Sequence, residues 1–213
     1  MARILLIKSS PLPDALSRST QIARIFLDET LKLHPNDTAT ELDLYNMDLP
    51  LIDLDVLTAR DKQRRGETLT VEEAAKIKTL DTLADQFIGA DKYIFVSPLW
   101  NLGIPPLLKA YFDAITVAGK TFAYTEHGSK GLLKNKVAIH IHGCGVVYSD
   151  GKIPQFADPY VRGILTFFGV DVLPTIFVEG IDEHPENAEA ILAKAAEEAR
   201  EAAKHFDVHT VLA

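Results

Sequence analysis

Short apolar runs alternate with amphipathic runs along most of the chain, and this alternation limits the possible folds more than any other feature. The apolar runs typically have the length and aliphatic content of buried strands. Because parallel neighbours need a crossover, strands separated by helices predict a parallel sheet covered on both faces. The runs are ARILLI (2–7), TATELDL (38–44), KYIFVS (92–97), KVAIHIH (136–142) and DVLPTIFVEG (171–180).

The segments between these runs carry helix signals. Thr70 with Glu73 three positions later forms a capping box, and Gly169 is placed to end a helix. Residues 45–69 are expected to be irregular or partly helical. The predicted helices span residues 17–33, 71–88, 105–117, 156–168 and 186–206.

The right-handed crossover rule leaves few topologies for five parallel strands. We expect an α/β three-layer sandwich with the flavodoxin-like strand order 2-1-3-4-5. The chain has 213 residues, of which 47% are hydrophobic, and this suits one core. We therefore expect residues 1–213 to form a single domain.

Charge and cysteine content exclude several classes of function. A net charge of −8 argues against nonspecific binding to nucleic acid or to anionic membranes. The single cysteine permits no intramolecular disulfide and is typical of a reducing cytoplasm. We expect no signal peptide and no membrane span, because no apolar stretch approaches 18 residues.

Three loops are expected to meet at one site. In a doubly wound sheet, ligands bind beyond the carboxyl ends of the strands, beside the first strand. The loops that follow the first, third and fourth strands therefore converge there. Their sequences are SSPLPDALSRST (9–20), PLWNLGIP (98–105) and GCGVVYSDG (143–151).

The first loop has the composition of a phosphate site. It runs into a helix N-terminus, where unpaired N–H groups favour an anion. Ser10, Ser17 and Ser19 add hydroxyl groups, and Arg18 adds a positive charge. No dinucleotide or nucleoside-triphosphate motif is present. In the alternative interpretation, Ser17 only caps the helix.

The second loop has the rigidity expected of a surface for a flat ring. Pro98 restricts the end of the strand, so the N–H groups of Trp100 and Asn101 could face the edge of a heterocycle. The Asn101 amide both donates and accepts hydrogen bonds. In the alternative interpretation, Trp100 is a partly buried packing residue.

Two other candidate sites are set aside. His140 and His142 share one face of a strand, but no further metal ligand stands nearby in sequence, so we expect no metal site. Cys144 would need a positioned base to act as a nucleophile, and a small loop residue is the favoured interpretation.

Four motifs give the chain a resemblance to FMN-dependent NADH-azoreductases and NAD(P)H:quinone reductases. They are KSSPLPDALSRS, SPLWNLGIPPLLKAYFD, AGKTFAYTEHGSKGLLKNK and HGCGVVYSDG. The resemblance implies an FMN cofactor, NADH or NADPH as donor, and ping-pong hydride transfer to quinones and aromatic azo compounds. It also implies a homodimer with active sites at the subunit interface.

The same resemblance implies which residues contact the flavin. Phe122 and Tyr148 would line the substrate pocket. The chain departs from the family pattern at Leu102, where an aromatic residue is usual, and at Gly143-Cys144-Gly145-Val146, where Ser-x-Gly-Gly is usual. The implied FMN-binding residues are Ser10, Ser17, Arg18, Ser19, Pro98, Leu99, Trp100, Asn101, Leu102, Gly143, Cys144, Gly145 and Tyr148.

Three functions remain open at this point. The first is an NAD(P)H oxidoreductase in which the flavin carries the redox chemistry, so no acid–base triad is needed. Donors such as the N–H groups of Gly143 and Gly145 and the Asn101 side chain would stabilise the reduced flavin. The others are a flavodoxin-type electron carrier without NADH turnover and a regulatory protein of the same fold without flavin.

Overall fold

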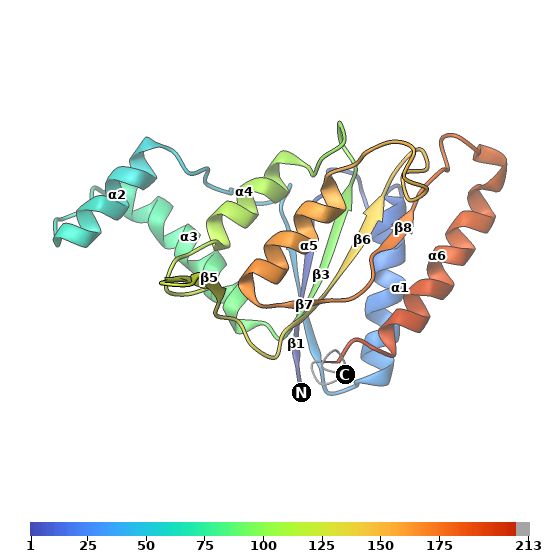
Figure 1. Ribbon diagram of the computed structural model, residues 1–213, viewed down its shortest axis with the longest axis horizontal. Helices are drawn as coiled ribbons and strands as arrows, with labels where there is room; N and C mark the ends of the chain where they lie inside the picture. The colour runs from blue at the N-terminus through green and yellow to red at the C-terminus, as the bar shows by residue number, and fades with distance from the viewer. Residues whose placement is uncertain (208–213) are drawn as a thin grey trace.

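A parallel sheet forms the middle layer of the computed structural model, which describes residues 1–207 (Figure 1). The strand order is β2-β1-β3-β6-β7, with β8 also paired to β6, which confirms the predicted order. The last six residues of the predicted 1–213 domain lie outside the described residues. The strands are β1 (Arg3–Lys8), β2 (Thr38–Asp43), β3 (Lys92–Pro98), β6 (Val137–Gly143), β7 (Asp171–Val172) and β8 (Ile176–Val178).

The predicted fifth strand, placed within residues 171–180, is present but interrupted. It is divided into β7 and β8, and Pro174 lies in the gap between them. Proline has no N–H to contribute to a ladder. The Arg162 guanidinium donates to the carbonyl oxygens of Val172 and Leu173 at 3.4 and 2.6 Å, which satisfies backbone groups near the break.

Two helical layers cover the sheet. On one face, α1 (Arg18–Leu33) and α6 (Ala188–Ala203) pack on side chains such as Ile4 and Leu6. On the other face, the core includes Leu5 and Ile7, because successive strand residues point to opposite sides. Figure 1 shows α2 (Leu54–Arg65) away from the sheet, against α3 (Val71–Gly89). The second layer consists of α3 (Val71–Gly89), α4 (Pro106–Ile115) and α5 (Ala157–Phe168).

The helix ends largely follow the sequence signals. The Thr70–Glu73 capping box is present in full, and Gly169 ends α5 with a φ of 90°. The predicted helix 186–206 is shorter, because the 3₁₀ turn η1 (Pro185–Asn187) precedes α6. Within residues 1–207, no helix has the length and hydropathy needed to cross a membrane.

A small antiparallel hairpin, β4 (Phe122–Thr125) with β5 (Gly128–Gly131), was not predicted as a sheet. Gly131 places this hairpin against the end of α5. A Cβ at this position would lie 2.3 Å from the carbonyl carbon of Phe168, so only glycine permits the contact.

The register of β3 aligns the carboxyl ends of three strands. Lys8 of β1 pairs with Val96 of β3, and Pro98 of β3 pairs with Gly143 of β6. The loops that follow these strands therefore leave the sheet at the same edge.

Candidate functional site

The three predicted loops meet at one cavity of about 350 Å³. Nine of the predicted site residues line it, as do Leu12 and Leu16 of the first loop. Val178 and Asp182, from the end of β8 and the segment after it, complete the wall. The nine are Ser10, Ser17, Arg18, Ser19, Pro98, Leu99, Gly143, Cys144 and Gly145.

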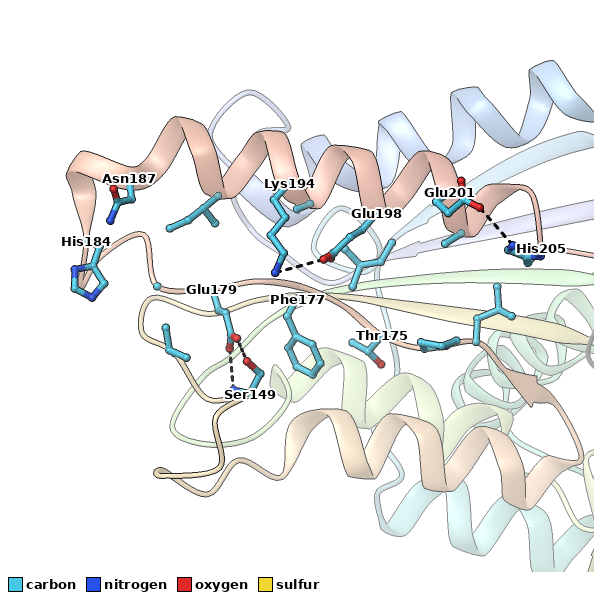
Figure 2. Close-up of a pocket in the computed structure, with 18 residues that line it drawn as sticks. Ser149, Thr175, Phe177, Glu179, His184, Asn187, Lys194, Glu198, Glu201 and His205 are labelled. Carbon is cyan, nitrogen blue, oxygen red and sulfur yellow. Dashed lines mark hydrogen bonds and ion pairs between the residues drawn. The ribbon is translucent and has the colours of Figure 1, made fainter.

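A larger cavity of about 790 Å³ lies elsewhere, along the edge of the sheet between β8 and α6. Figure 2 shows Lys194 and Glu198 of α6 on one side of it and Phe177 of β8 on the other. None of the predicted site residues lines this edge groove. Ligands of doubly wound sheets bind beyond the strand ends, so the smaller cavity is the candidate site.

Buried charges fix the shape of the first loop. The Lys8 ammonium lies 2.8 Å from Asp14 and 3.1 Å from Asp43, and its side chain is 7% exposed. Arg24 of α1 also pairs with Asp14, at 2.6 Å. The hydrogen bond from Lys8 lowers the pKa of Asp14. Burial opposes the charge of Asp43, but hydrogen bonds from Asn46 and Lys8 still lower its pKa.

Ser17 serves the helix and also faces the cavity. Its Oγ accepts from the Thr20 N–H at 3.4 Å and from the Thr20 hydroxyl at 2.7 Å, so the capping interpretation is correct. Both bonds use Ser17 as an acceptor, which leaves its own proton available to a ligand. Capping and ligand binding are therefore compatible at this residue.

Arg18 is already paired within the chain. Its guanidinium lies 2.7 Å from Asp182, which also lines the cavity. Both side chains are substantially exposed, at 42% and 63%. An exposed pair of this kind contributes only about 0–1 kcal/mol, so an anionic ligand can compete for Arg18 at little cost.

The second loop forms a tight reverse turn over residues 100–103. Trp100 and Gly103 exchange backbone hydrogen bonds, each 3.0 Å long, across Asn101 and Leu102. Both central residues have positive φ, 48° and 67°, as this hairpin geometry requires. The predicted role of the Trp100 N–H toward a ligand is wrong, because that group donates to Gly103.

The third loop lies close to the first and is held by acidic residues. A Cβ on Gly143 would lie 3.2 Å from the Ser19 hydroxyl, and one on Gly145 would lie 2.4 Å from Asp182. Glycine at these positions allows the backbone to line the cavity. Glu179 accepts from the backbone N–H of Tyr148 at 2.9 Å.

Cys144 lines the cavity as a neutral thiol. Burial, together with the nearby Glu179 carboxylate, raises its pKa to about 12. A thiol that keeps its proton is a poor nucleophile, which favours the interpretation of Cys144 as a small loop residue. Within residues 1–207, no group of three or more His, Cys, Asp and Glu side chains could hold a metal ion.

Five predicted residues do not line the cavity. Trp100, Asn101 and Leu102 are exposed in the turn beside it, and Tyr148 lies beyond Gly145 in the third loop. Phe122 is buried in β4 and packs on Phe167 of α5, with ring centroids 4.9 Å apart. Their roles toward a ligand stay predictions.

Sequence reasoning missed Asp182, Glu179 and Tyr45. Tyr45 packs edge-on against Trp100 at 6.1 Å, and its buried hydroxyl has no hydrogen-bond partner within the described residues. The segment after β8 leaves the sheet at the same edge as the other loops. The reasoning that selected the other three loops would therefore also have selected Asp182 and Glu179.

The comparisons with known proteins agree with this arrangement. A family model described as "Flavodoxin-like fold" matches residues 2–203. The chain belongs to this family. The protein is 49% identical over 211 residues to FMN-dependent NADH:quinone oxidoreductase 2 of Listeria innocua, across 97% of this chain and all of the relative. It is 45% identical over 208 residues to the FMN-dependent NADH:quinone oxidoreductase of Staphylococcus haemolyticus, with the same coverage.

Solved structures give the same picture. An azoreductase of Bacillus anthracis str. Sterne superposes with a TM-score of 0.88 at 37% identity, covering 97% of this chain and all of the other. A FMN-dependent NADH-azoreductase of Bacillus anthracis str. Ames Ancestor, solved in complex with FMN, gives a TM-score of 0.89 at 32% identity. That alignment covers 96% of this chain and 98% of the other.

Replacing Lys8 with methionine tests the ion cluster under the first loop. We expect Lys8→Met to lower the free energy of unfolding by about 2–3 kcal/mol, at the low end for a buried pair because Asp14 is partly exposed. Asp14 and Asp43 have lowered pKa values in the folded state. The stability that these two carboxylates contribute is therefore fully present above about pH 4, near the pKa of an unfolded aspartate. It is lost as the pH falls through their lowered pKa values in the folded protein.

Urea unfolding of the wild type and of Lys8→Met between pH 3 and pH 7 measures the free energy of unfolding of each. That free energy should fall less steeply with decreasing pH in the variant than in the wild type. Lys204→Met is the matched control, because Lys204 forms an exposed pair with Glu201 and its loss should leave the free energy of unfolding nearly unchanged. Equal stability losses in the two variants would contradict a structural role for the cluster.

Proposed function

We propose that the protein is an FMN-dependent NADH:quinone oxidoreductase that also reduces aromatic azo compounds. The observation that carries the proposal is the meeting of three loops at one cavity, which is lined by hydroxyl groups and Arg18 of the first loop and by two glycines of the third. Relatives that match nearly the whole length of the chain carry the names of such enzymes.

The residues at the cavity fit the phosphate of FMN. The start of α1 presents unpaired N–H groups, and Ser10, Ser17 and Ser19 present hydroxyls. Arg18 supplies the charge once the phosphate takes the place of Asp182. The close approach of Gly143 to Ser19 closes this side of the cavity with backbone, which leaves room for a ligand rather than a side chain.

The ring of FMN would lie against Pro98, Leu99 and the turn formed by residues 100–103. When bound, FMN supplies the redox chemistry, taking a hydride from NADH and passing it to the acceptor. The Asn101 amide and the backbone at Gly145 would donate hydrogen bonds to the ring edge and favour its reduced, anionic form. Trp100 and Tyr148 would border the open face.

One open face accounts for the proposed ping-pong order. NADH and the acceptor would occupy the same space in turn, because the other face of the ring would rest on the loops. Tyr148 would line that space. The single cysteine and the net charge of −8 suit a cytoplasmic enzyme.

We also propose that the protein acts as a homodimer with its active sites at the subunit interface. Four large apolar side chains in and before α2 are exposed, and they lie in one short segment: Leu51, Ile52, Leu54 and Leu57. A cluster of this kind is typical of a surface that another chain covers.

Sedimentation equilibrium tests the dimer. We expect a mass about twice the 23.5 kDa of the chain. The variant Leu54→Glu/Leu57→Glu should sediment as a monomer, because two charges would be buried in the interface. The matched control is Val71→Glu, a single charge at the equally exposed start of α3. A wild-type protein of monomeric mass would contradict the proposal.

The phosphate assignment is tested with Arg18→Gln/Ser19→Ala. Loss of charge-assisted hydrogen bonds costs about 1.5–3 kcal/mol, so we expect the dissociation constant for FMN to rise about 10- to 100-fold in a fluorescence titration. Arg64→Gln/Ser129→Ala makes the same chemical changes at exposed positions outside the site and should leave the affinity unchanged. Unaltered affinity in the first variant would remove the assignment.

The reaction class is tested on wild-type protein loaded with FMN. Anaerobic NADH should bleach the flavin band, and a quinone should restore it. Bleaching by dithionite but not by NADH would instead support an electron carrier.

A further inference from the structure

A chain of buried hydrogen bonds runs beneath the turn formed by residues 100–103. The Ser97 hydroxyl lies 2.9 Å from Nε2 of His140, and Nδ1 of the same ring lies 2.9 Å from Asp158. The Thr175 hydroxyl donates to the same Asp158 oxygen at 2.5 Å. Ser97 and His140 are completely buried, and Asp158 is 9% exposed.

The chemistry of these groups fixes the direction of each bond. Burial opposes the charge of Asp158, but hydrogen bonds from His140 and Thr175 hold its pKa below the ordinary value, so the carboxylate only accepts. His140 therefore carries its proton on Nδ1. Burial lowers the pKa of His140, so the ring is neutral and its Nε2 accepts from the Ser97 hydroxyl.

His142 extends the chain by one step. Its Nδ1 lies 3.2 Å from both the hydroxyl and the carbonyl oxygen of Ser97, so this nitrogen is the donor. Burial and the neighbouring His140 lower the pKa of His142 to about 3, which keeps the ring neutral. Each member from His142 to Asp158 thus donates in the same direction, toward the carboxylate.

The order Ser–His–Asp is the one that hydrolases use for nucleophilic attack. Here Ser97 has no exposed surface and lines neither of the two cavities described above. A carbonyl substrate could not reach its hydroxyl. The chain of hydrogen bonds from Ser97 to Asp158 therefore has a structural role and not a catalytic one.

The chain joins the two segments that support the turn. Ser97 directly precedes Pro98 at the end of β3, where the Leu99 N–H donates to the Gly143 carbonyl at 2.7 Å. Asp158 lies in the first turn of α5. The residue just before that helix, Phe156, donates its N–H to the Leu102 carbonyl at 2.7 Å.

The start of α5 is held by packing as well as by polar contacts, because Ala157 is completely buried and Tyr160 packs on Phe112. Its N-cap, Phe156, makes no side-chain cap, and the Asp158 N–H is satisfied by Gln155 at 3.0 Å. The hydrogen bond between Asp158 and His140 is a buried polar link that joins this helix start to β6. The turn formed by residues 100–103, whose two central residues have positive φ, is joined to this helix start by the hydrogen bond from the Phe156 N–H to the Leu102 carbonyl.

We propose that Ser97, His140 and Asp158 are positioning residues that set the turn formed by residues 100–103 through the start of α5. That this turn supports the FMN ring rests on the function proposed above. The positioning itself is a property of the protein without flavin.

Asp158→Asn tests the proposal, because it keeps the volume and removes the charge that orders the chain. Its matched control is Asp37→Asn, the same change at the opposite end of the sheet, where Asp37 accepts from the buried Lys92 at 3.0 Å. Both variants should lower the melting temperature, but only Asp158→Asn should alter the turn.

The first measurement uses flavin-free protein. Hydrogen exchange followed by NMR should show the amides of Gly103 and Phe156 exchanging at least tenfold faster in Asp158→Asn than in wild type, with no change in Asp37→Asn. Nitrogen-15 spectra should show His140 neutral with its proton on Nδ1 in wild type. Unchanged exchange at both amides, or a proton on Nε2, would overturn the proposal.

The second measurement uses FMN-loaded protein. Asp158→Asn should weaken FMN binding about tenfold and shift its midpoint potential, whereas Asp37→Asn should change neither. Wild-type protein that binds no FMN would refute the proposed function alone, since the exchange result stands without flavin. If Asp158→Asn does not fold, Thr175→Val, which removes one of the two donors to Asp158, should still accelerate exchange at Phe156. No acceleration in that variant would overturn the proposal.

Discussion

The pairing of β3 between β1 and β6 is the constraint on which the rest of the structure depends. Its register brings Lys8, Pro98 and Gly143 to one edge of the sheet, and the three loops begin there. A shift of one residue would reverse which side chains face each helical layer. The buried faces of β3 and its neighbours therefore fix the position of the site as well as the core.

The site is built from polar groups that are satisfied on the protein side. Buried charges under the first loop, acidic residues behind the third loop and the Ser97–His140–Asp158 chain under the second each hold backbone in place. What remains available at the cavity is mainly donors: the start of α1, hydroxyls and Arg18. Such a preorganised set of donors suits an anionic ligand and loses little entropy on binding.

The sequence predicted the layers, the strand order and the loops of the site, because these follow from hydrophobic runs and the geometry of parallel sheets. The break of the fifth strand was missed although Pro174 is a local signal for it. The β4–β5 hairpin could not be predicted, because it depends on the tertiary contact of Gly131 with α5. Asp182 was missed because the loop after the last strand was left out of the predicted site, although it leaves the sheet at the same edge. Its pairing with Arg18, 164 positions away, has no local sequence signal. The Trp100 N–H was assigned to a ligand because the sequence does not reveal the turn formed by residues 100–103. That turn needs a positive φ at Asn101 and at Leu102, and a positive φ is unusual for leucine.

Hydrogen–deuterium exchange with and without saturating FMN tests the central claim most directly. That claim is that three loops at one sheet edge hold a single mononucleotide. We expect FMN to slow exchange in residues 9–20, 98–105 and 143–151 together, and to leave α6 unchanged. Slowed exchange along β8 and α6 without protection of the three loops would contradict the account.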